Sequence, residues 1–131
     1  MQKVKELSVI IVIIIAVFTA NTITQNYTNK AVKLLTDKLD ELVESTKKQE
    51  IDNSKRMKIA FEIEKIWEQK KSKLSYFIEH DEVEKVEINI KAILSYLESE
   101  DLVMAKTESE QAIFLLEHIK DKYELSLENI F

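Results

Sequence analysis

Glycine, proline and cysteine are all missing from this chain of 131 residues. Without glycine and proline, tight turns and β-hairpins lack the residues that usually form them, whereas the helix formers Lys, Glu, Leu, Ile and Ala dominate the composition. The absence of cysteine excludes disulfides, thiolate metal sites and lipoprotein processing. Gly-x-Ser-x-Gly motifs and glycine-rich phosphate loops are absent as well. We therefore expect an all-α protein that is not an enzyme and holds no cofactor.

Arginine is nearly absent too, because the basic side chains are 18 lysines and one arginine, a skew typical of AT-rich genomes. Residues 24–73 carry 12 basic and 9 acidic groups, whereas residues 74–131 carry 5 basic and 14 acidic groups. The interpretation we favour is attraction between two helical hairpins of opposite sign; the alternative is an acidic surface for a partner or cations. The net charge of −5 argues against binding to nucleic acid.

Long apolar runs are rare except for one near the N-terminus. Leu7–Ile23 reads LSVIIVIIIAVFTANTI, and its 17 residues would form a helix of about 26 Å, against a hydrocarbon core of about 30 Å. The side chains of Lys3 and Lys5 can snorkel to the membrane surface, which compensates for the short helix. Residues Ile10–Ile15 are apolar on every face, unlike a surface helix. We therefore predict that residues 1–23 are a membrane anchor.

A cleaved signal peptide is the competing interpretation of this segment. Cleavage needs small residues one and three positions before the cut. Cuts after the two alanines of the run would place Phe18 or Ile14 at the upstream position. These bulky side chains favour retention of the anchor.

Basic residues near the run predict its orientation. Lys3 and Lys5 precede it, and residues 21–29 after it carry no charge. The positive-inside rule then places the N-terminus in the cytoplasm and residues 24–131 outside, with one pass through the cytoplasmic membrane. So little chain would lie inside that any signal would pass laterally to another membrane protein.

After the anchor, apolar residues recur at helical spacing in four stripes. The first stripe continues the anchor without a break and predicts one long helix from about Lys5 to about Lys48. Four amphipathic helices joined by short polar turns imply an antiparallel four-helix bundle over residues 24–131. The stripes are Tyr27, Ala31, Leu34, Leu35, Leu39, Leu42 and Val43; Ile59, Ala60, Ile63, Ile66, Trp67, Leu74, Phe77 and Ile78; Val83, Val86, Ile90, Ile93, Leu94 and Leu97; and Leu102, Ala105, Ala112, Ile113, Leu116, Ile119 and Tyr123.

Polar residues between the stripes predict the turns and caps. The cluster around Asp52 begins the second helix, and Asp101 or Ser99 begins the fourth. Asp81 precedes Glu84 by three residues, a spacing that predicts a capping box for the third helix.

The last residues are apolar, which is unusual for a free terminus. We expect Leu127, Ile130 and Phe131 to cover the end of the core, near Phe77 and Ile78.

The only histidines are His80 and His118, and His80 lies in the sequence Glu79–Glu82, a potential metal cluster of oxygen and nitrogen ligands. Consecutive residues do not face one another on a helix, however. His80 at the end of one helix and Asp81 as the cap of the next explain the motif without a metal, so we predict none. His118 is expected on the rim, and Trp67 in the core.

Trp67, the run Leu74-Ser75-Tyr76-Phe77-Ile78-Glu79-His80-Asp81-Glu82 and the ending Ser126–Phe131 together resemble the family of domain of unknown function 4363. The resemblance covers the whole chain. It implies a small membrane-anchored helical protein of low-GC bacteria, similar to accessory proteins encoded near other small membrane proteins, and it supplies no catalytic residues.

Two functions compete on these observations. The first is an accessory protein that binds another membrane or envelope protein through its helical domain. The alternative is an extracytoplasmic sensor that holds a small ligand or cation between its helices. A cavity lined by Lys70, His80 or His118 would favour the sensor, and a packed apolar core would favour the accessory protein.

Overall fold

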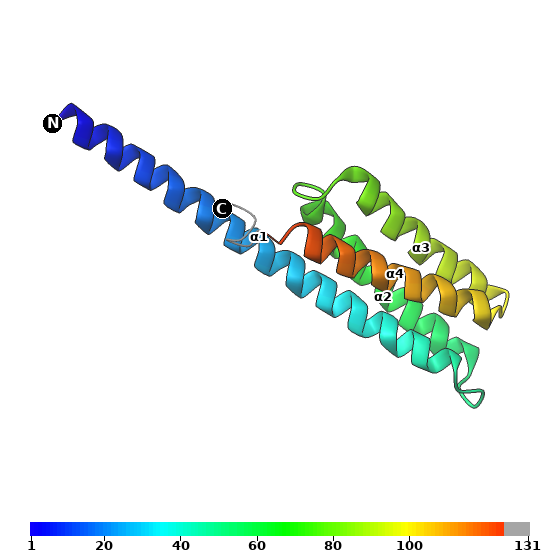
Figure 1. Ribbon diagram of the computed structural model, residues 1–131. Coiled ribbons are helices and arrows are strands. Elements are labelled where there is room, and N and C mark those ends of the chain that lie inside the picture. Colours follow the sequence, from blue (N-terminus) through cyan, green and yellow to red (C-terminus); the bar gives the residue numbers. More distant parts are fainter. Residues whose placement is uncertain (125–131) are drawn as a thin grey trace.

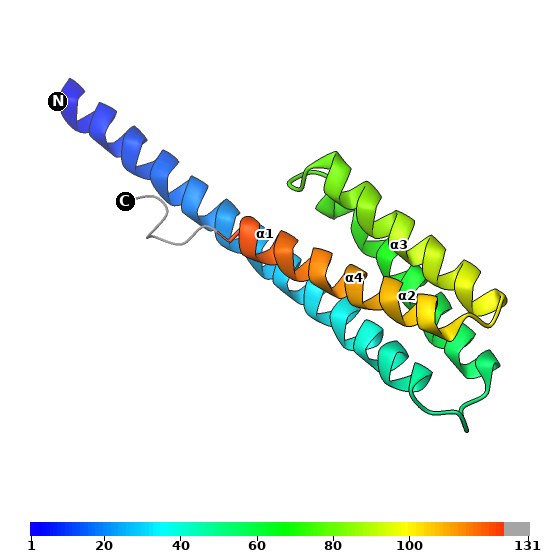
Figure 2. The ribbon, with the colours of Figure 1, turned by 45° about the vertical axis from the view of Figure 1, so that its right-hand side comes forward.

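The computed structural model describes residues 1–124, and its secondary structure is entirely α-helical (Figure 1). The second half of the first helix packs with the other three helices into an antiparallel bundle, while its first half projects from one end (Figures 1 and 2). We call that end proximal and the opposite end distal. The predicted all-α bundle is confirmed. The helices are α1 (Gln2–Thr46), α2 (Asn53–Leu74), α3 (His80–Glu98) and α4 (Leu102–Lys122).

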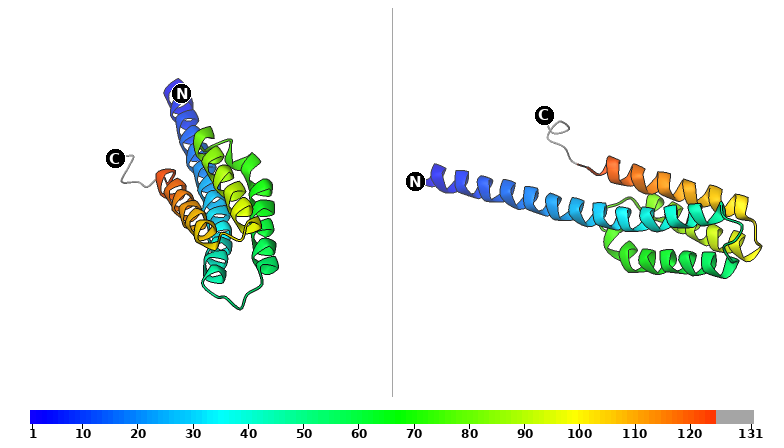
Figure 3. Two further views of the ribbon diagram at one scale, coloured as in Figure 1. Left: turned by 90° about the vertical axis from the view of Figure 1, so that its right-hand side faces the viewer. Right: turned by 90° about the horizontal axis from the view of Figure 1, so that it is seen from below.

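The bundle has a square arrangement. Helix α1 packs against α2 and α4, and α3 packs against the same two helices. Helices α2 and α4 therefore occupy opposite corners. Both begin at the distal end and run toward the proximal end, as the side view shows (Figure 3).

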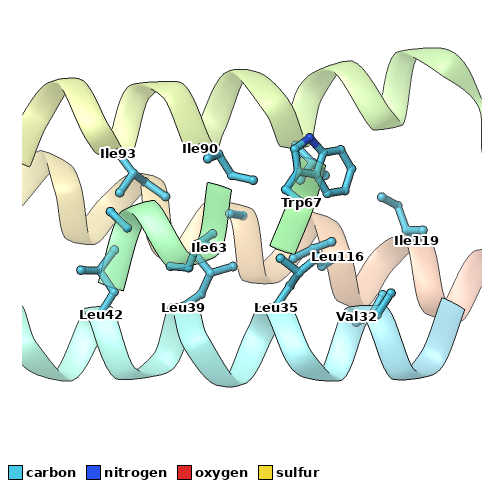
Figure 4. Close-up of a cluster of buried hydrophobic side chains, with 14 of the residues drawn as sticks. Val32, Leu35, Leu39, Leu42, Ile63, Trp67, Ile90, Ile93, Leu116 and Ile119 are labelled. Atoms are coloured by element: carbon cyan, nitrogen blue, oxygen red, sulfur yellow. The ribbon is translucent and has the colours of Figure 1, made fainter. Parts of the chain in front are cut away.

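The core consists of the apolar stripes that the sequence predicted, joined into one cluster (Figure 4). Trp67 is 2% exposed in its centre, as expected. The prediction that Leu34 belongs to the first buried stripe is wrong. Leu34 is 43% exposed, because it lies about 100° around the helix from buried Leu35. Ser109 is fully buried, and its hydroxyl donates to the Ala105 carbonyl at 2.7 Å, which removes the cost of burying it.

Helix α1 is continuous, close to the predicted limits of Lys5 and Lys48. The apolar side chains of its first half are exposed, and this half is long and apolar enough to cross a membrane. The hydroxyl groups along this half have hydrogen-bond partners within the helix, because each donates to the carbonyl four residues earlier. They can therefore lie in lipid without unpaired donors. These donors are Ser8, Thr19, Thr22 and Thr24, at 2.8–2.9 Å.

Two of the predicted helix starts are confirmed and one is wrong. The carboxylates of Asp52 and Asp101 accept the backbone N–H groups of Ser54 and Met104. The third helix, however, begins at His80, with Glu79 rather than Asp81 at the cap.

The reason for this earlier start lies in the backbone of Glu79. Its N–H donates to the Tyr123 hydroxyl at 3.0 Å, and its carbonyl accepts the N–H groups of Glu82 and Val83. A tertiary contact therefore fixes the first helical turn two residues before the predicted cap. Asp81 lies within that turn, where its negative charge suits the helix dipole. His80 opens α3 instead of closing α2.

Backbone groups at the distal end are satisfied by specific partners. Arg56, the single arginine, is 4% exposed and donates to the carbonyls of Ser45 at 3.0 Å and Lys48 at 2.7 Å. The Asn53 side-chain amide donates to the Leu97 carbonyl at 2.8 Å. These three carbonyls each accept a backbone N–H as well, so the side chains of Arg56 and Asn53 add a second donor to them and tie neighbouring helix ends together.

Helix α3 ends in a Schellman motif without glycine. Glu100 has φ of 57°, in the left-handed region that glycine usually occupies. Its N–H donates to the Leu97 carbonyl at 3.1 Å, and the Asp101 N–H donates to the Tyr96 carbonyl at 2.8 Å.

The expected contacts of Leu127, Ile130 and Phe131 with the end of the core lie outside the described residues.

Candidate functional site

An aromatic and basic cluster marks the proximal end of the bundle. Tyr27 lies on α1 four residues after Ile23, the last residue of the apolar run. Its ring meets Phe77 edge to face, with centroids 6.2 Å apart and an interplanar angle of 89°. The ammonium groups of Lys70 and Lys73 lie 5.4 and 5.5 Å from the Tyr27 ring centroid. We call these four residues the Tyr27 cluster.

The start of α3 and the end of α4 are joined beside this cluster by an ion-pair triad. Lys122 Nζ lies 3.2 Å from Glu79 Oε1 and 3.1 Å from Glu82 Oε1. Hydrogen bonds to these two carboxylates raise the pKa of the Lys122 ammonium above its usual range. Burial likewise raises the pKa of the neighbouring Tyr123 hydroxyl, which accepts the Glu79 N–H. The triad therefore fixes the α2–α3 turn against α4.

The side chain at the tip of this turn has no hydrogen-bond or ring partner among residues 1–124. Tyr76 is 87% exposed, although its neighbours Leu74 and Ile78 are buried. A large amphipathic side chain on a turn held at both sides is suited to contact another surface.

The two histidines lie apart and in different surroundings. His80 is exposed at the start of α3, and Asp81 beside it is exposed too. Because Glu79 and Glu82 both pair with Lys122, the sequence cluster does not converge on one point. His118 is exposed on α4 and stacks on Phe114, with centroids 6.5 Å apart. Within residues 1–124, no group of three or more His, Asp or Glu side chains could hold a metal ion.

The hollows that the structure forms between α1 and its neighbours are open and are lined mainly by charged side chains. One lies between α1 and α2, beside Lys38 and Glu62, and two lie between α1 and α4, one beside Lys120 and one beside Phe114. Lys70, His80 and His118 line none of these three hollows.

Comparison with known protein families assigns the chain to one of them. The family described as "Domain of unknown function (DUF4363)" matches residues 22–130. The chain belongs to this family. The match confirms the family that the sequence resembled, and it covers residues 22–130 instead of the whole chain, so most of the apolar run lies outside it. No curated protein and no solved structure matches the chain.

Sequence reasoning missed two exposed aromatic side chains on the sides of the bundle. Phe114 on α4 is 72% exposed and Phe61 on α2 is 53% exposed. Both lie off the apolar stripes, and that off-stripe position was the signal available in the sequence. An aromatic residue at such a position differs from the small aliphatic exceptions that every helix carries, because it exposes a large apolar area.

Proposed function

We propose that this protein is a single-pass membrane protein whose helical domain binds another membrane or envelope protein as an accessory subunit. The observation that carries the proposal is the continuity of α1, whose exposed apolar half runs without a break into the buried half. A helix of this kind holds the bundle at a fixed height and orientation over the membrane. The bundle then serves as a rigid surface for a neighbour in the same membrane.

The exposed half of α1 supports the anchoring. Residues Val9–Val17 carry large apolar side chains around the whole helix. Each of these large side chains is about half exposed or more. An apolar surface of this extent is unfavourable in water and marks a membrane or protein contact. Lys3 and Lys5 before the run, and the uncharged residues 21–29 after it, favour an N-terminus in the cytoplasm and a bundle outside.

The position of the proximal end supports a membrane neighbour as the partner. Tyr27 lies four residues beyond the apolar run, about 6 Å along the helix, which corresponds to the headgroup layer of a bilayer. The Tyr27 cluster and the exposed ring of Tyr76 would thus meet the part of a membrane protein that emerges from the lipid. Tyrosine is a common anchor in such interfaces.

Photo-crosslinking in native membranes tests this function. A photoreactive amino acid at Tyr76 in the full chain should give an adduct with a second, different protein. The matched control places the same group at Ser99, which is exposed in the turn at the distal end. We expect the adduct at Tyr76 and none at Ser99. Adducts at both positions with equal yield, or lipid adducts alone at Tyr76, would contradict the proposal.

A further inference from the structure

Two outward faces of the bundle carry matching patterns. On α4, Phe114 points directly away from the core, about 180° around the helix from the buried residues, and Glu110 and Glu117 flank it. On α2, Phe61 is exposed between Lys58 and Lys65. We call these the α4 face (Glu110, Phe114, Glu117) and the α2 face (Lys58, Phe61, Lys65).

The spacing of the two faces agrees along the helices. The two glutamates are seven residues apart, and so are the two lysines. When α2 of one molecule lies parallel to α4 of another, the lysines align with the glutamates. The two phenylalanines then differ by one position, or about 1.5 Å of helical rise. Each face thus has an aromatic centre and two charges of one sign, and the signs are opposite.

The heights of the two faces agree as well. Both helices begin at the distal end, and Lys58 lies five residues into α2, whereas Glu110 lies eight residues into α4. The difference is about 4.5 Å, which is less than one helical turn. Molecules that share one orientation therefore present the two faces at nearly the same level.

The charges of the two faces are only weakly engaged within one molecule. Glu110 and Glu117 lie 3.9 and 3.8 Å from lysines on their own helix, long exposed pairs that contribute little. Within the part of the chain that the structure describes, neither Lys58 nor Lys65 forms an ion pair within 4 Å. After Lys38, whose hydrogen bond has the largest effect, these two lysines lower the pKa of the Glu62 carboxyl by charge attraction alone. The charged groups of both faces can therefore still pair with a neighbour.

We propose that the α2 face of one molecule docks on the α4 face of a second copy in the same membrane. The inference rests on the proposed anchoring, because only molecules fixed in one orientation align the two helices in parallel. Since α2 and α4 occupy opposite corners, each molecule has one face of each kind on opposite sides. Contacts of this head-to-tail type generate rings or open rows.

The size of the contact makes membrane anchoring essential. A single helix against a single helix buries much less than a standard protein interface, so the free domains would associate weakly in solution. Anchoring in two dimensions raises the effective concentration and removes most wrong orientations. The assembly is therefore expected in membranes and not for dilute protein in detergent.

Cysteine crosslinking of the full chain in phosphatidylcholine vesicles tests the contact. The chain has no cysteine, so Gln69→Cys and Asp121→Cys each introduce a unique thiol. These exposed positions lie four residues beyond Lys65 and Glu117, so they face each other in the proposed contact. Oxidation of a mixture of the two variants should form dimers about tenfold faster than either variant alone, because only the mixture brings unlike faces together.

Charge reversal adds a rescue that a merely structural effect would not show. Lys58→Glu with Lys65→Glu should abolish the excess crosslinking, and so should Glu110→Lys with Glu117→Lys. In the rescue mixture, the Gln69→Cys molecule also carries both reversed lysines, and the Asp121→Cys molecule also carries both reversed glutamates. This mixture should restore the excess crosslinking. The matched control is Lys85→Glu with Lys91→Glu on exposed positions of α3, which should leave crosslinking unchanged.

Three outcomes would overturn the proposal: no excess crosslinking in the mixture, crosslinking that ignores charge reversal, or preferential pairing of like variants. Resistance of the same vesicles to alkaline extraction is measured in parallel. Extraction of the protein would contradict the proposed anchoring itself. An anchored protein without the excess crosslinking would contradict only the self-association.

Discussion

The two halves of α1 are one continuous helix, yet they have opposite surroundings. In the first half, Ile13 is 56% exposed and its apolar neighbours surround the whole helix. In the second half, Leu39 is completely buried, and a charged outer face includes the ion pair between Lys33 and Asp37. The apolar stripe of the second half is covered by α2 and α4. The arrangement of apolar residues, more than their number, distinguishes a helix that packs in a bundle from one that needs lipid.

The two halves of α1 are also mechanically continuous. No glycine or proline separates the halves, and α1 has no break between Gln2 and Thr46. A change in the first half should therefore affect attachment to the membrane, and a change in the second half should affect folding of the bundle. The predictions below separate these two properties, with Trp67 as the single fluorescent reporter of the core.

The largest effect is expected for truncation of a core side chain in the second half. Leu39→Ala should lower the free energy of unfolding by about 2–5 kcal/mol, because it leaves a cavity in the centre of the bundle. The full chain in detergent micelles is unfolded with denaturant and followed by Trp67 fluorescence. Ile13→Ala is the matched change in the first half and should leave the midpoint unchanged. Equal shifts for both variants would remove the distinction between the halves.

A charge in the first half should have the next largest effect, on attachment and not on unfolding. Ile13→Lys places an ammonium near the middle of the proposed span, at a cost of about 2.5–3.5 kcal/mol on insertion scales. We expect more of this variant in the soluble fraction after alkaline extraction of membranes. Leu34→Lys, at the exposed position of the second half, is the control and should extract like the parent chain. Loss of attachment for both would point to a misfolded protein instead of a lipid-facing residue.

The distal turn offers a stabilising change that leaves the membrane half untouched. Glu100→Gly should raise the free energy of unfolding by up to about 1 kcal/mol, because glycine has no Cβ penalty at positive φ. Lys91→Gly, at an exposed position in the interior of α3, should instead lower stability by about 0.5–1 kcal/mol. Thermal unfolding of both variants provides the measurement. A Glu100→Gly protein less stable than its parent would contradict the Schellman geometry.

The smallest effect concerns the ion pair between α2 and α3. A hydrogen bond from Lys71, at 2.9 Å, lowers the pKa of Glu87 below its ordinary value of 4.5. A depressed folded-state pKa stabilises the bundle above pH 4.5, and this contribution is lost as the pH falls through the folded-state value. Glu87→Gln should therefore flatten the loss of stability in acid, by less than about 1 kcal/mol for a partly exposed pair.

Denaturant unfolding between about pH 3 and pH 7 measures this linkage. Glu84→Gln on an exposed position of the same helix is the control. An identical pH profile for the parent and Glu87→Gln would show that the pair does not contribute. Neither variant should change attachment to the membrane.

The sequence predicted the bundle well because periodicity encodes it directly. Each stripe, from Ala31 in α1 to Ile119 in α4, identified buried positions without any knowledge of the partners. The caps at Asp52 and Asp101 were also local, since each carboxylate bonds to a backbone N–H within three residues. What failed was the start of α3, where a hydrogen bond between residues 44 apart in the chain decides the first turn.

The candidate sites were harder to predict for the same reason. The Tyr27 cluster joins α1 to the end of α2, and the triad of Lys122 joins α4 to α3. Such contacts depend on which helix ends meet, and periodicity does not specify this. The buried role of Arg56 was likewise invisible, because its two carbonyl partners lie at the end of another helix. The sequence shows that Phe61 and Phe114 lie off the apolar stripes. Only the structure shows that they lie at a similar height on opposite corners of the bundle.

Accessibility of single cysteines in the apolar half of α1 and just beyond its C-terminal end tests most directly whether one helix joins lipid to the bundle. The full chain is produced in bacterial cells with Ile13→Cys or Lys48→Cys and treated with a membrane-impermeant maleimide before and after permeabilisation. We predict that Lys48→Cys is labelled in intact cells and that Ile13→Cys stays protected until the membrane is dissolved in detergent. Rapid labelling of Ile13→Cys in intact cells, or of Lys48→Cys only after permeabilisation, would contradict this prediction.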